Sequence, residues 1–447
     1  MMFFLISLFN NINKYMRLTS KQFKLTNIIY TSIYFIVGVL VIARGAIYFP
    51  DSYTFVDMAL NHSPAYCTFL KIFTSIFGDY FELPVVIAQY IIIAFGVHFF
   101  VQTLNNVFHI HKVGVLIIQL ISLAPSVYVH NLGSAILSEA LAYPIFLVIF
   151  ALTLKLFVEE NLKYVYKIGA LLFVLILTRG QFLALVPALI LIVGYIIFKT
   201  KSFKKHFYFL AILIAIPLLT SFTERVYNKI VFDHFINNAM NYVHLIASPF
   251  YIANKSDINL FTDADESAYF NLIYSSLKEA ELTRNQNFKT GGLDDYLFYH
   301  FNFSEICNRR IYELGLSYYE AKGLNFIEQN VALNTLCSKM VGPLIKQNFK
   351  VWLKFFLKNL SHSFGSSKYM LFFGVLLFYG VLNLLKSNRS VYKFIVIATL
   401  FMFANNALIA LVIHSIKRYV FYFDWVIFAT FIILLNEIFK YQKRRES

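Results

Sequence analysis

The chain has 447 residues, of which 59% are hydrophobic and only 14% are charged, and its mean hydropathy is +0.63. Soluble domains carry about 25% charged residues, so this composition excludes a soluble globular enzyme and predicts an all-α polytopic membrane protein. The net charge of +15 does not indicate nucleic-acid binding, because the basic residues lie mainly in short loops between apolar runs.

Membrane-spanning helices appear in a sequence as apolar runs of about 17 to 25 residues. Ten such spans are predicted, at 26–46, 84–104, 113–129, 134–156, 164–179, 181–198, 207–223, 369–386, 394–414 and 420–438. The fifth and sixth share one run that is too long for a single crossing. Its break at Thr178-Arg179-Gly180-Gln181 predicts a tight hairpin.

The orientation follows from the distribution of Lys and Arg. With the N-terminus in the cytoplasm, 19 of these residues fall in inner loops and tails, and 5 fall in short outer loops and rims. We therefore expect both termini to be cytoplasmic. The expected location is the plasma (inner) membrane. Residues 1–25 are expected to be a cytoplasmic lead-in, followed by a first span that acts as an uncleaved signal.

Two outer segments are long. In the first, 47–83, Ser63-Pro64 is typical of a helix start, and the apolar face that follows predicts a helix lying in the membrane interface. The second, 224–350, is expected to be a mostly helical insertion between spans 7 and 8. One helix is expected to open at 262–266, and another is expected to run from Ser304 to Lys322. An amphipathic return helix and three C-terminal spans then fill 351–447, and 26–223 forms a seven-span module.

The three cysteines, Cys67, Cys307 and Cys337, all fall on the outer side of this topology. A Cys307–Cys337 bridge would suit an oxidising compartment, and free buried thiols are the alternative. Their spacing does not resemble a zinc site. No cluster of ligands is evident, so neither a metal nor a cofactor is assigned; a carboxylate pair with a bound divalent ion is the alternative.

Asp51 lies in the block Pro50-Asp51-Ser52-Tyr53, just past the first span. A carboxylate at the outer mouth of a helix bundle can take a proton from an acceptor hydroxyl, which makes Asp51 a candidate general base. Asp51 also follows a proline and precedes a helical run, so helix N-capping is the alternative interpretation.

Glu139 is an ionisable residue near the outer end of the fourth span. Such groups are costly in a membrane and usually face a polar cavity, although a carboxylate at the rim could instead reach the lipid headgroups. His130 and Asn131 precede Glu139 in the same outer turn. His130 is a candidate substrate contact, with a plain interface residue as the alternative.

Arg179, Lys417 and Arg418 are cations at the outer rim, against the general distribution of charge. The planar fork of Arg bonds two phosphate oxygens, which suggests a pocket for a lipid phosphate; snorkelling to the headgroups is the alternative. Asp424 could neutralise one of these cations. Asn405 and Asn406 lie within the ninth span, where we expect hydrogen bonds between helices.

This layout resembles the GT-C superfamily of integral membrane glycosyltransferases, which includes protein O-mannosyltransferases and lipid A aminoarabinose transferases. Three short motifs carry the resemblance: Pro50-Asp51-Ser52-Tyr53 with the residues up to Ala59, Ser138-Glu139-Ala140-Leu141, and Thr178-Arg179-Gly180-Gln181. They are similar to the family's first outer loop, to the acidic start of its fourth span and to its Arg-Pro-Gln hairpin, with Gly180 in place of Pro. The resemblance covers residues 26–223 and the late Arg418-Tyr419.

The resemblance implies an inverting glycosyltransferase that works on the extracytoplasmic face with a polyprenyl-phosphate sugar donor and a lipid, glycan or protein acceptor. Asp51 is then the base, Arg179, Lys417 and Arg418 hold the departing phosphate, and Glu139 orients a sugar. Tyr53 and His130 complete the expected substrate-binding set. Three alternatives stay open: a lipid-linked glycan polymerase or ligase, a non-enzymatic transporter or flippase, and a scaffold.

Overall fold

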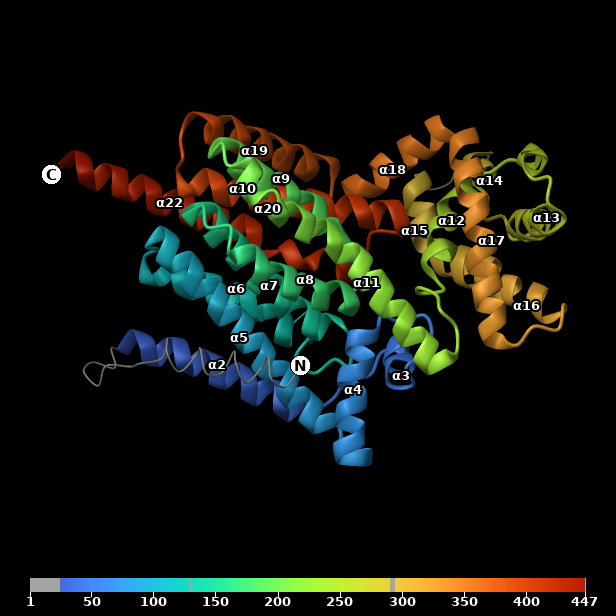
Figure 1. Cartoon of the computed structure of the whole chain (residues 1–447), viewed down its shortest axis with the longest axis horizontal. Coiled ribbons are helices and arrows are strands. Elements are labelled where there is room, and N and C mark those ends of the chain that lie inside the picture. The colour runs from blue at the N-terminus through green and yellow to red at the C-terminus, as the bar shows by residue number, and fades with distance from the viewer. Residues whose placement is uncertain (1–24, 129–130, 290–293, 447) are drawn as a thin grey trace.

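The computed structural model describes residues 25–128, 131–289 and 294–446 (Figure 1). These residues are predominantly helical, and the isolated β-bridge among them joins Ile47 and Ala135 in parallel. Seven of the described helical segments are long and apolar enough to cross a membrane, namely Glu82–Phe108, Glu139–Glu159, Gly180–Lys199, Phe203–Phe232, Ser367–Lys386, Ser390–Val412 and Lys417–Lys440. The chain is therefore a helical, multi-pass membrane protein.

Three further apolar helices are shorter. α2 (Leu25–Arg44), α6 (Lys112–Val127) and α8 (Tyr164–Thr178) coincide with the predicted spans 26–46, 113–129 and 164–179. Their described apolar stretches fall below the length of a full crossing, so the total of ten spans stays a prediction.

The remaining bundle elements follow in chain order. They are α5 (Glu82–Phe108), α7 (Glu139–Glu159), η2 (Gly180–Ala184), α9 (Leu185–Lys199), α10 (Phe203–His206), α11 (Tyr208–Phe232), α19 (Ser367–Lys386), α20 (Ser390–Val412), α21 (Lys417–Val420), η5 (Phe421–Phe423) and α22 (Trp425–Glu446). The break between α8 and η2 falls at Arg179, where the fifth and sixth predicted spans divide.

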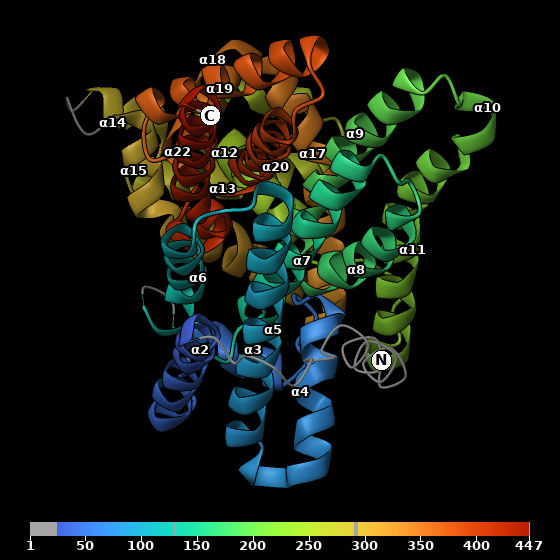
Figure 2. The ribbon, with the colours of Figure 1, turned by 90° about the vertical axis from the view of Figure 1, so that its left-hand side faces the viewer.

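α7 is the central helix of the bundle. It is apolar on all sides and mostly buried, and it packs against α5, α8 and α20 (Figure 2), whereas α19 is largely exposed at the surface of the protein. α5 and α7 approach very closely, since a Cβ atom on Gly96 would lie 2.6 Å from Cβ of Pro144. Glycine is required at this contact.

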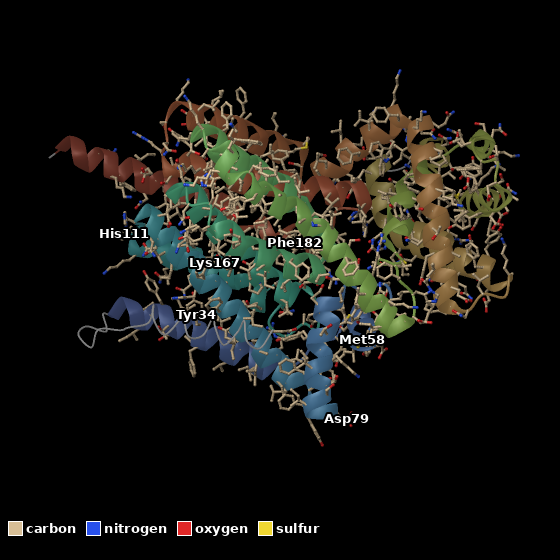
Figure 3. All side chains as sticks on the ribbon, viewed as in Figure 1. Tyr34, Met58, Asp79, His111, Lys167 and Phe182 are labelled. Atoms are coloured by element: carbon tan, nitrogen blue, oxygen red, sulfur yellow. The ribbon has the colours of Figure 1, made fainter. Side chains whose placement is uncertain are left out.

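The segment that joins α2 to α5, predicted to be the first outer loop, contains two short helices, α3 (Pro50–Val56) and α4 (Pro64–Phe77), followed by η1 (Gly78–Tyr80). α4 begins as predicted, with Ser63 at the N-cap and Pro64 at the first helical position. It runs across the direction of the bundle helices and exposes Ile72 and Ile76 (Figure 1). Met58 of this segment lies far from His111, which marks the opposite end of the bundle (Figure 3).

The insertion builds a hydrophobic core of its own. Its elements are α12 (Asn241–Ile252), η3 (Lys255–Leu260), α13 (Ala264–Glu279), α14 (Arg284–Lys289), α15 (Asp295–Phe303), the π-helix η4 (Ser304–Glu313), α16 (Leu314–Glu320) and α17 (Phe326–Gln347). α13 opens where predicted, with Asp263 capping its first turn. The helix predicted to begin at Ser304 begins at Asp295 in the structure, because α15, η4 and α16 form one continuous helical run.

The predicted boundary at 224 lies inside α11, which continues to Phe232. Polar residues interrupt the apolar pattern there without ending the helix, and one of them, Asn228, donates from Nδ2 to the backbone oxygen of Ile236 at 2.8 Å. The predicted return helix is α18 (Phe349–Ser363). Cys67, Cys307 and Cys337 are buried and free, so the alternative of a Cys307–Cys337 bridge does not occur in this structure.

Candidate functional site

Asp51 lies in the first turn of α3, and α3 lies at the end of the bundle next to the insertion (Figure 1). The helix start is held by its neighbours, because the backbone N–H of Phe49 donates to Ser52 Oγ at 2.8 Å and that of Ser52 donates to Phe49 O at 2.8 Å. Asp51 is therefore not the N-cap, and its carboxylate can bond to other partners. Its side chain is 46% exposed.

Glu139 is the first residue of α7, which begins five residues later than the predicted span at 134. Residues 134–136 instead run alongside Ile47, whose N–H donates to Ser134 O at 2.8 Å and whose oxygen accepts from Ile136 N at 3.0 Å. Gln89 Nε2 also donates to Ala135 O at 3.1 Å. The Glu139 side chain is only 1% exposed, so it faces the protein interior and not the lipid headgroups.

Arg179 occupies the extended residue between α8 and η2, with φ at −152°. Its Nη1 lies 2.7 Å from Glu139 Oε1 and 3.1 Å from Ser138 Oγ, and its guanidinium lies 5.4 Å from the ring centre of Tyr419. Burial disfavours the charged form, but the Glu139 carboxylate outweighs this effect and the pKa of Arg179 lies above its ordinary value. Arg179 stays cationic.

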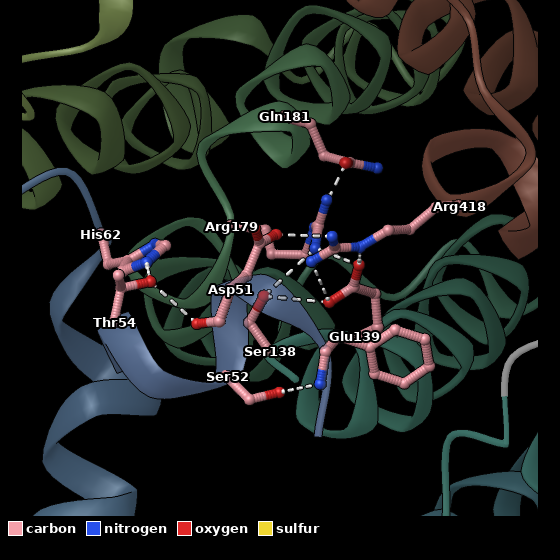
Figure 4. A network of polar contacts seen from close by, with 10 residues as sticks. Asp51, Ser52, Thr54, His62, Ser138, Glu139, Arg179, Gln181 and Arg418 are labelled. Atoms are coloured by element: carbon pink, nitrogen blue, oxygen red, sulfur yellow. Dashed lines mark hydrogen bonds and ion pairs between the residues drawn. The ribbon is translucent and has the colours of Figure 1, made fainter. Parts of the chain in front are cut away.

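Arg418, on the short helix α21, joins the two carboxylates. Its Nη1 lies 2.6 Å from Asp51 Oδ2, its Nε donates to Glu139 Oε1, and its Nη2 lies 3.4 Å from Glu139 Oε2. Figure 4 shows Asp51, Glu139, Arg179 and Arg418 converging from four separate parts of the chain. We call these four residues the quartet.

The quartet has a buried end and an exposed end. Side-chain exposure rises from 1% at Glu139 to 11% at Arg179, 25% at Arg418 and 46% at Asp51. Two carboxylates and two guanidiniums give a formal charge of zero. The buried charges are thus paired, as low-dielectric surroundings require, while Asp51 presents a carboxylate to the outside.

Three residues of the expected substrate-binding set lie elsewhere. Lys417 is exposed, and its Nζ lies 2.6 Å from Asp424 Oδ1, so it is neutralised outside the quartet. Tyr53 is exposed, with its ring 5.1 Å from that of Tyr48. His130 lies outside the described residues.

Gln181 belongs to the hairpin motif, and its sequence position alone indicates no role for it. Its Oε1 accepts from Arg179 Nε at 3.2 Å, and its Nε2 donates to Asn405 Oδ1 and to Tyr419 O, both at 3.1 Å. The hydrogen bonds between helices expected for Asn405 and Asn406 are confirmed, since Asn406 Nδ2 also donates to Ser363 O at 3.3 Å. This amide chain connects Arg179 to the backbone of α21.

His62 and Thr54 support the backbone beside Asp51 and were not singled out from the sequence. Thr54 Oγ1 donates to Asp51 O at 2.9 Å, and its oxygen lies 2.6 Å from His62 Nε2. The imidazole stacks on Phe55, with ring centres 3.9 Å apart. Burial lowers the pKa of His62 to about 4, so the ring is neutral at pH 7.

The insertion also contributes to the surroundings of Asp51. Burial lowers the pKa of His244, on α12, to about 4, and the negative charge of Asp51 partly opposes this shift. An electrostatic influence of this kind requires the two groups to be near each other. The charge of Asp51 is thus felt by a residue of the insertion.

The quartet offers an exposed carboxylate beside cationic groups that are fixed by buried partners. Such an arrangement can accept a proton at Asp51 and stabilise negative charge at the outer face of Arg418. Among the residues that the structure describes, no group of three or more His, Cys, Asp or Glu side chains could hold a metal ion. Comparisons of this chain with family models, with curated proteins and with solved structures found no match.

Proposed function

We propose that this protein is an inverting glycosyltransferase that moves a sugar from a polyprenyl-phosphate donor to an acceptor hydroxyl on the extracytoplasmic face of the plasma membrane. The observation that carries the proposal is the contact between Asp51 and Arg418 at the exposed end of the quartet. It brings together, across 367 residues of sequence, a base and a cation suited to a phosphate leaving group.

In the proposed reaction the acceptor oxygen attacks the anomeric carbon and forms a new C–O bond with inversion. The bond between that carbon and the phosphate oxygen breaks, and its electron pair leaves with the phosphate. The acceptor proton passes to the carboxylate of Asp51. General-base assistance of this kind contributes about 10²- to 10⁴-fold to a rate.

The cations have unequal roles in this proposal. Arg418 would contact the developing phosphate charge directly, because it is partly exposed and next to Asp51. Glu139 would position Arg179 and Arg418 and would not touch a sugar, since its side chain is 1% exposed and both oxygens accept hydrogen bonds. Lys417, paired with Asp424, would act only at the rim.

The test compares the lipids and glycans of the cell envelope by mass spectrometry in cells that lack the protein, cells that have it, and cells that carry Asp51→Asn. Asp57→Asn is the matched control, because Asp57 is an exposed acid at the end of the same helix, α3. We expect one glycosylated species to require the protein, to fall by at least about 100-fold with Asp51→Asn, and to persist with Asp57→Asn.

Two results would oppose the proposal. Near-normal product with Asp51→Asn would favour the polymerase or ligase, which does not use a carboxylate from the first outer loop. Identical glycans with and without the protein would exclude a transferase and favour a transporter or scaffold.

A further inference from the structure

The quartet has no free positive charge with which to bind an anion. Each guanidinium is bonded to a carboxylate, and the two negative and two positive groups cancel. An incoming phosphate must therefore displace one of the carboxylates, because a third anion beside a neutral, partly buried network would be left unpaired.

Only one of the two carboxylates can leave at low cost. Glu139 accepts from Arg179, Arg418 and Ser138 and has almost no exposed surface, so its departure would leave a buried charge without partners. Asp51 contacts Arg418 through one oxygen and is about half exposed, so water can solvate it after it leaves. Asp51 is the exchangeable partner.

We propose that the outer face of Arg418 is a phosphate-binding site that the Asp51 carboxylate occupies until substrate arrives. The ligand class is a phosphate monoester or diester. In this exchange the donor phosphate takes the place of Asp51 on Arg418, and only then is the carboxylate released to act as base. The inference rests on the proposed function, and it adds that phosphate binding and release of the base are one event.

The charges of the reaction fit this exchange. When Asp51 takes the acceptor proton it becomes neutral and no longer competes for Arg418, while the phosphate gains the electron pair of the broken bond and binds more strongly. When the proton later passes to water, the Asp51 carboxylate is restored and competes with the product phosphate. The return of Asp51 to Arg418 would therefore promote product release.

The test measures binding of farnesyl phosphate to the purified full-length protein in a phosphate-free detergent, with farnesol as the neutral analogue and inorganic phosphate as the analogue without a lipid chain. If Asp51 occupies Arg418 for about nine-tenths of the time, its removal raises phosphate affinity about tenfold. We expect this gain in Asp51→Asn and Asp51→Ala, unchanged affinity in Asp57→Asn, and unchanged farnesol binding in all variants.

Unchanged or weaker farnesyl phosphate binding in both Asp51 variants would overturn the exchange. Equal gains for inorganic phosphate and farnesyl phosphate would support it and show that the phosphate group alone is recognised, whereas a gain confined to farnesyl phosphate would support it with a lipid as the ligand. Arg418→Lys should weaken binding of the phosphate probes at least about fivefold, because a lysine cannot reproduce the two-pronged contact of a guanidinium, and retention of full affinity would count against the site.

The two proposals can fail separately. A tenfold gain in affinity without any glycan product would retain the phosphate site and reject the transferase. Conversely, a glycan product that depends on Asp51, together with unchanged affinity in the Asp51 variants, would retain the transferase and reject the exchange.

Discussion

Glu139 forms ion pairs with Arg179 and Arg418 and accepts a hydrogen bond from Ser138. Only 1% of its side chain is exposed. The sequence indicated an ionisable group near the end of a span, but it could not show where that group points. Its partner Arg418 lies 279 residues further along the chain. Pairings over such distances depend on packing of the whole bundle, which no local pattern encodes.

Glu139→Gln should destabilise the protein strongly, because it leaves two guanidiniums next to a single, half-exposed carboxylate. Removing one partner of a buried ion pair costs about 3–5 kcal/mol. Urea unfolding in detergent micelles would measure the loss. Asp51→Asn serves as the control, since a partly exposed pair is worth about 1 kcal/mol or less, and equal losses in the two variants would contradict the burial gradient.

His62→Gln should reduce the sensitivity of the protein to acid. The pKa of His62 is lowered by burial to about 4, while an unfolded histidine titrates near 6.5. As the pH falls, the unfolded state therefore binds the proton before the folded state does. The contribution of the neutral His62 ring to the free energy of unfolding is present above pH 6.5 and is lost as the pH falls toward 4. The loss amounts to about 2–3 kcal/mol for this ring.

Unfolding free energies measured between pH 7 and pH 4 for wild type and His62→Gln would isolate this contribution as the difference between two slopes. His244 and His414 also have their pKa lowered to about 4 by burial, so the variant should keep part of the acid sensitivity. Parallel pH profiles for the two proteins would show that the His62 ring takes up its proton in the folded state.

At the scale of elements, hydrophobic runs located the long apolar helices of the bundle, and the chief misplaced boundary has a clear cause. Ala135, Ile136 and Leu137 are as apolar as a span, so the sequence placed them inside the fourth span. They instead form a buried, non-helical segment bonded to Ile47. Apolar content alone does not distinguish a buried extended segment from a helix. The consequence is functional, because this segment places Glu139 at the first residue of α7.

Gly96→Ala should separate α5 from α7 and thereby disturb the start of α7. The added Cβ would lie 2.6–2.8 Å from Cβ, Cα and the carbonyl oxygen of Pro144, and backbone atoms cannot move aside as a flexible side chain can. Overpacking of this kind costs about 1–3 kcal/mol. Thermal unfolding in detergent would report it.

Gly194→Ala is the matched control for that substitution. Gly194 also lies within an apolar helix, α9, but no other atom lies within 4 Å of the position that an alanine Cβ would take there. Alanine should stabilise the helix by up to about 1 kcal/mol, because it is the better helix former. Destabilisation of similar size at both positions would show that the α5–α7 contact is not the cause.

At the scale of the whole molecule, the insertion and the return helix α18 are both tied to the segment that presents Arg418. Asn359 Nδ2 on α18 donates to the backbone oxygens of Ala410 and Ile413, both at 2.9 Å, and Ser415 Oγ donates to Asn359 Oδ1 at 2.7 Å. Tyr296 of α15 accepts from Ser415 N at 3.0 Å. These contacts fix residues 413–416 just before α21. The sequence predicted a separate outer insertion but not this attachment, which involves neutral polar residues without a recognisable motif.

The orientation in the membrane can be tested with single added thiols, because the three native cysteines are buried and should give little background labelling. Arg309→Cys places a thiol on the exposed surface of the insertion, and Arg389→Cys places one in the connection between α19 and α20, at the opposite end of the bundle (Figure 1). The excess of basic residues at that opposite end predicts that it faces the cytoplasm. A membrane-impermeant maleimide should therefore label Arg309→Cys in intact cells and Arg389→Cys only after permeabilisation. The reverse pattern would place the quartet on the cytoplasmic side, where nucleotide-linked sugars are the available donors, and would remove the reason for expecting a polyprenyl-phosphate substrate.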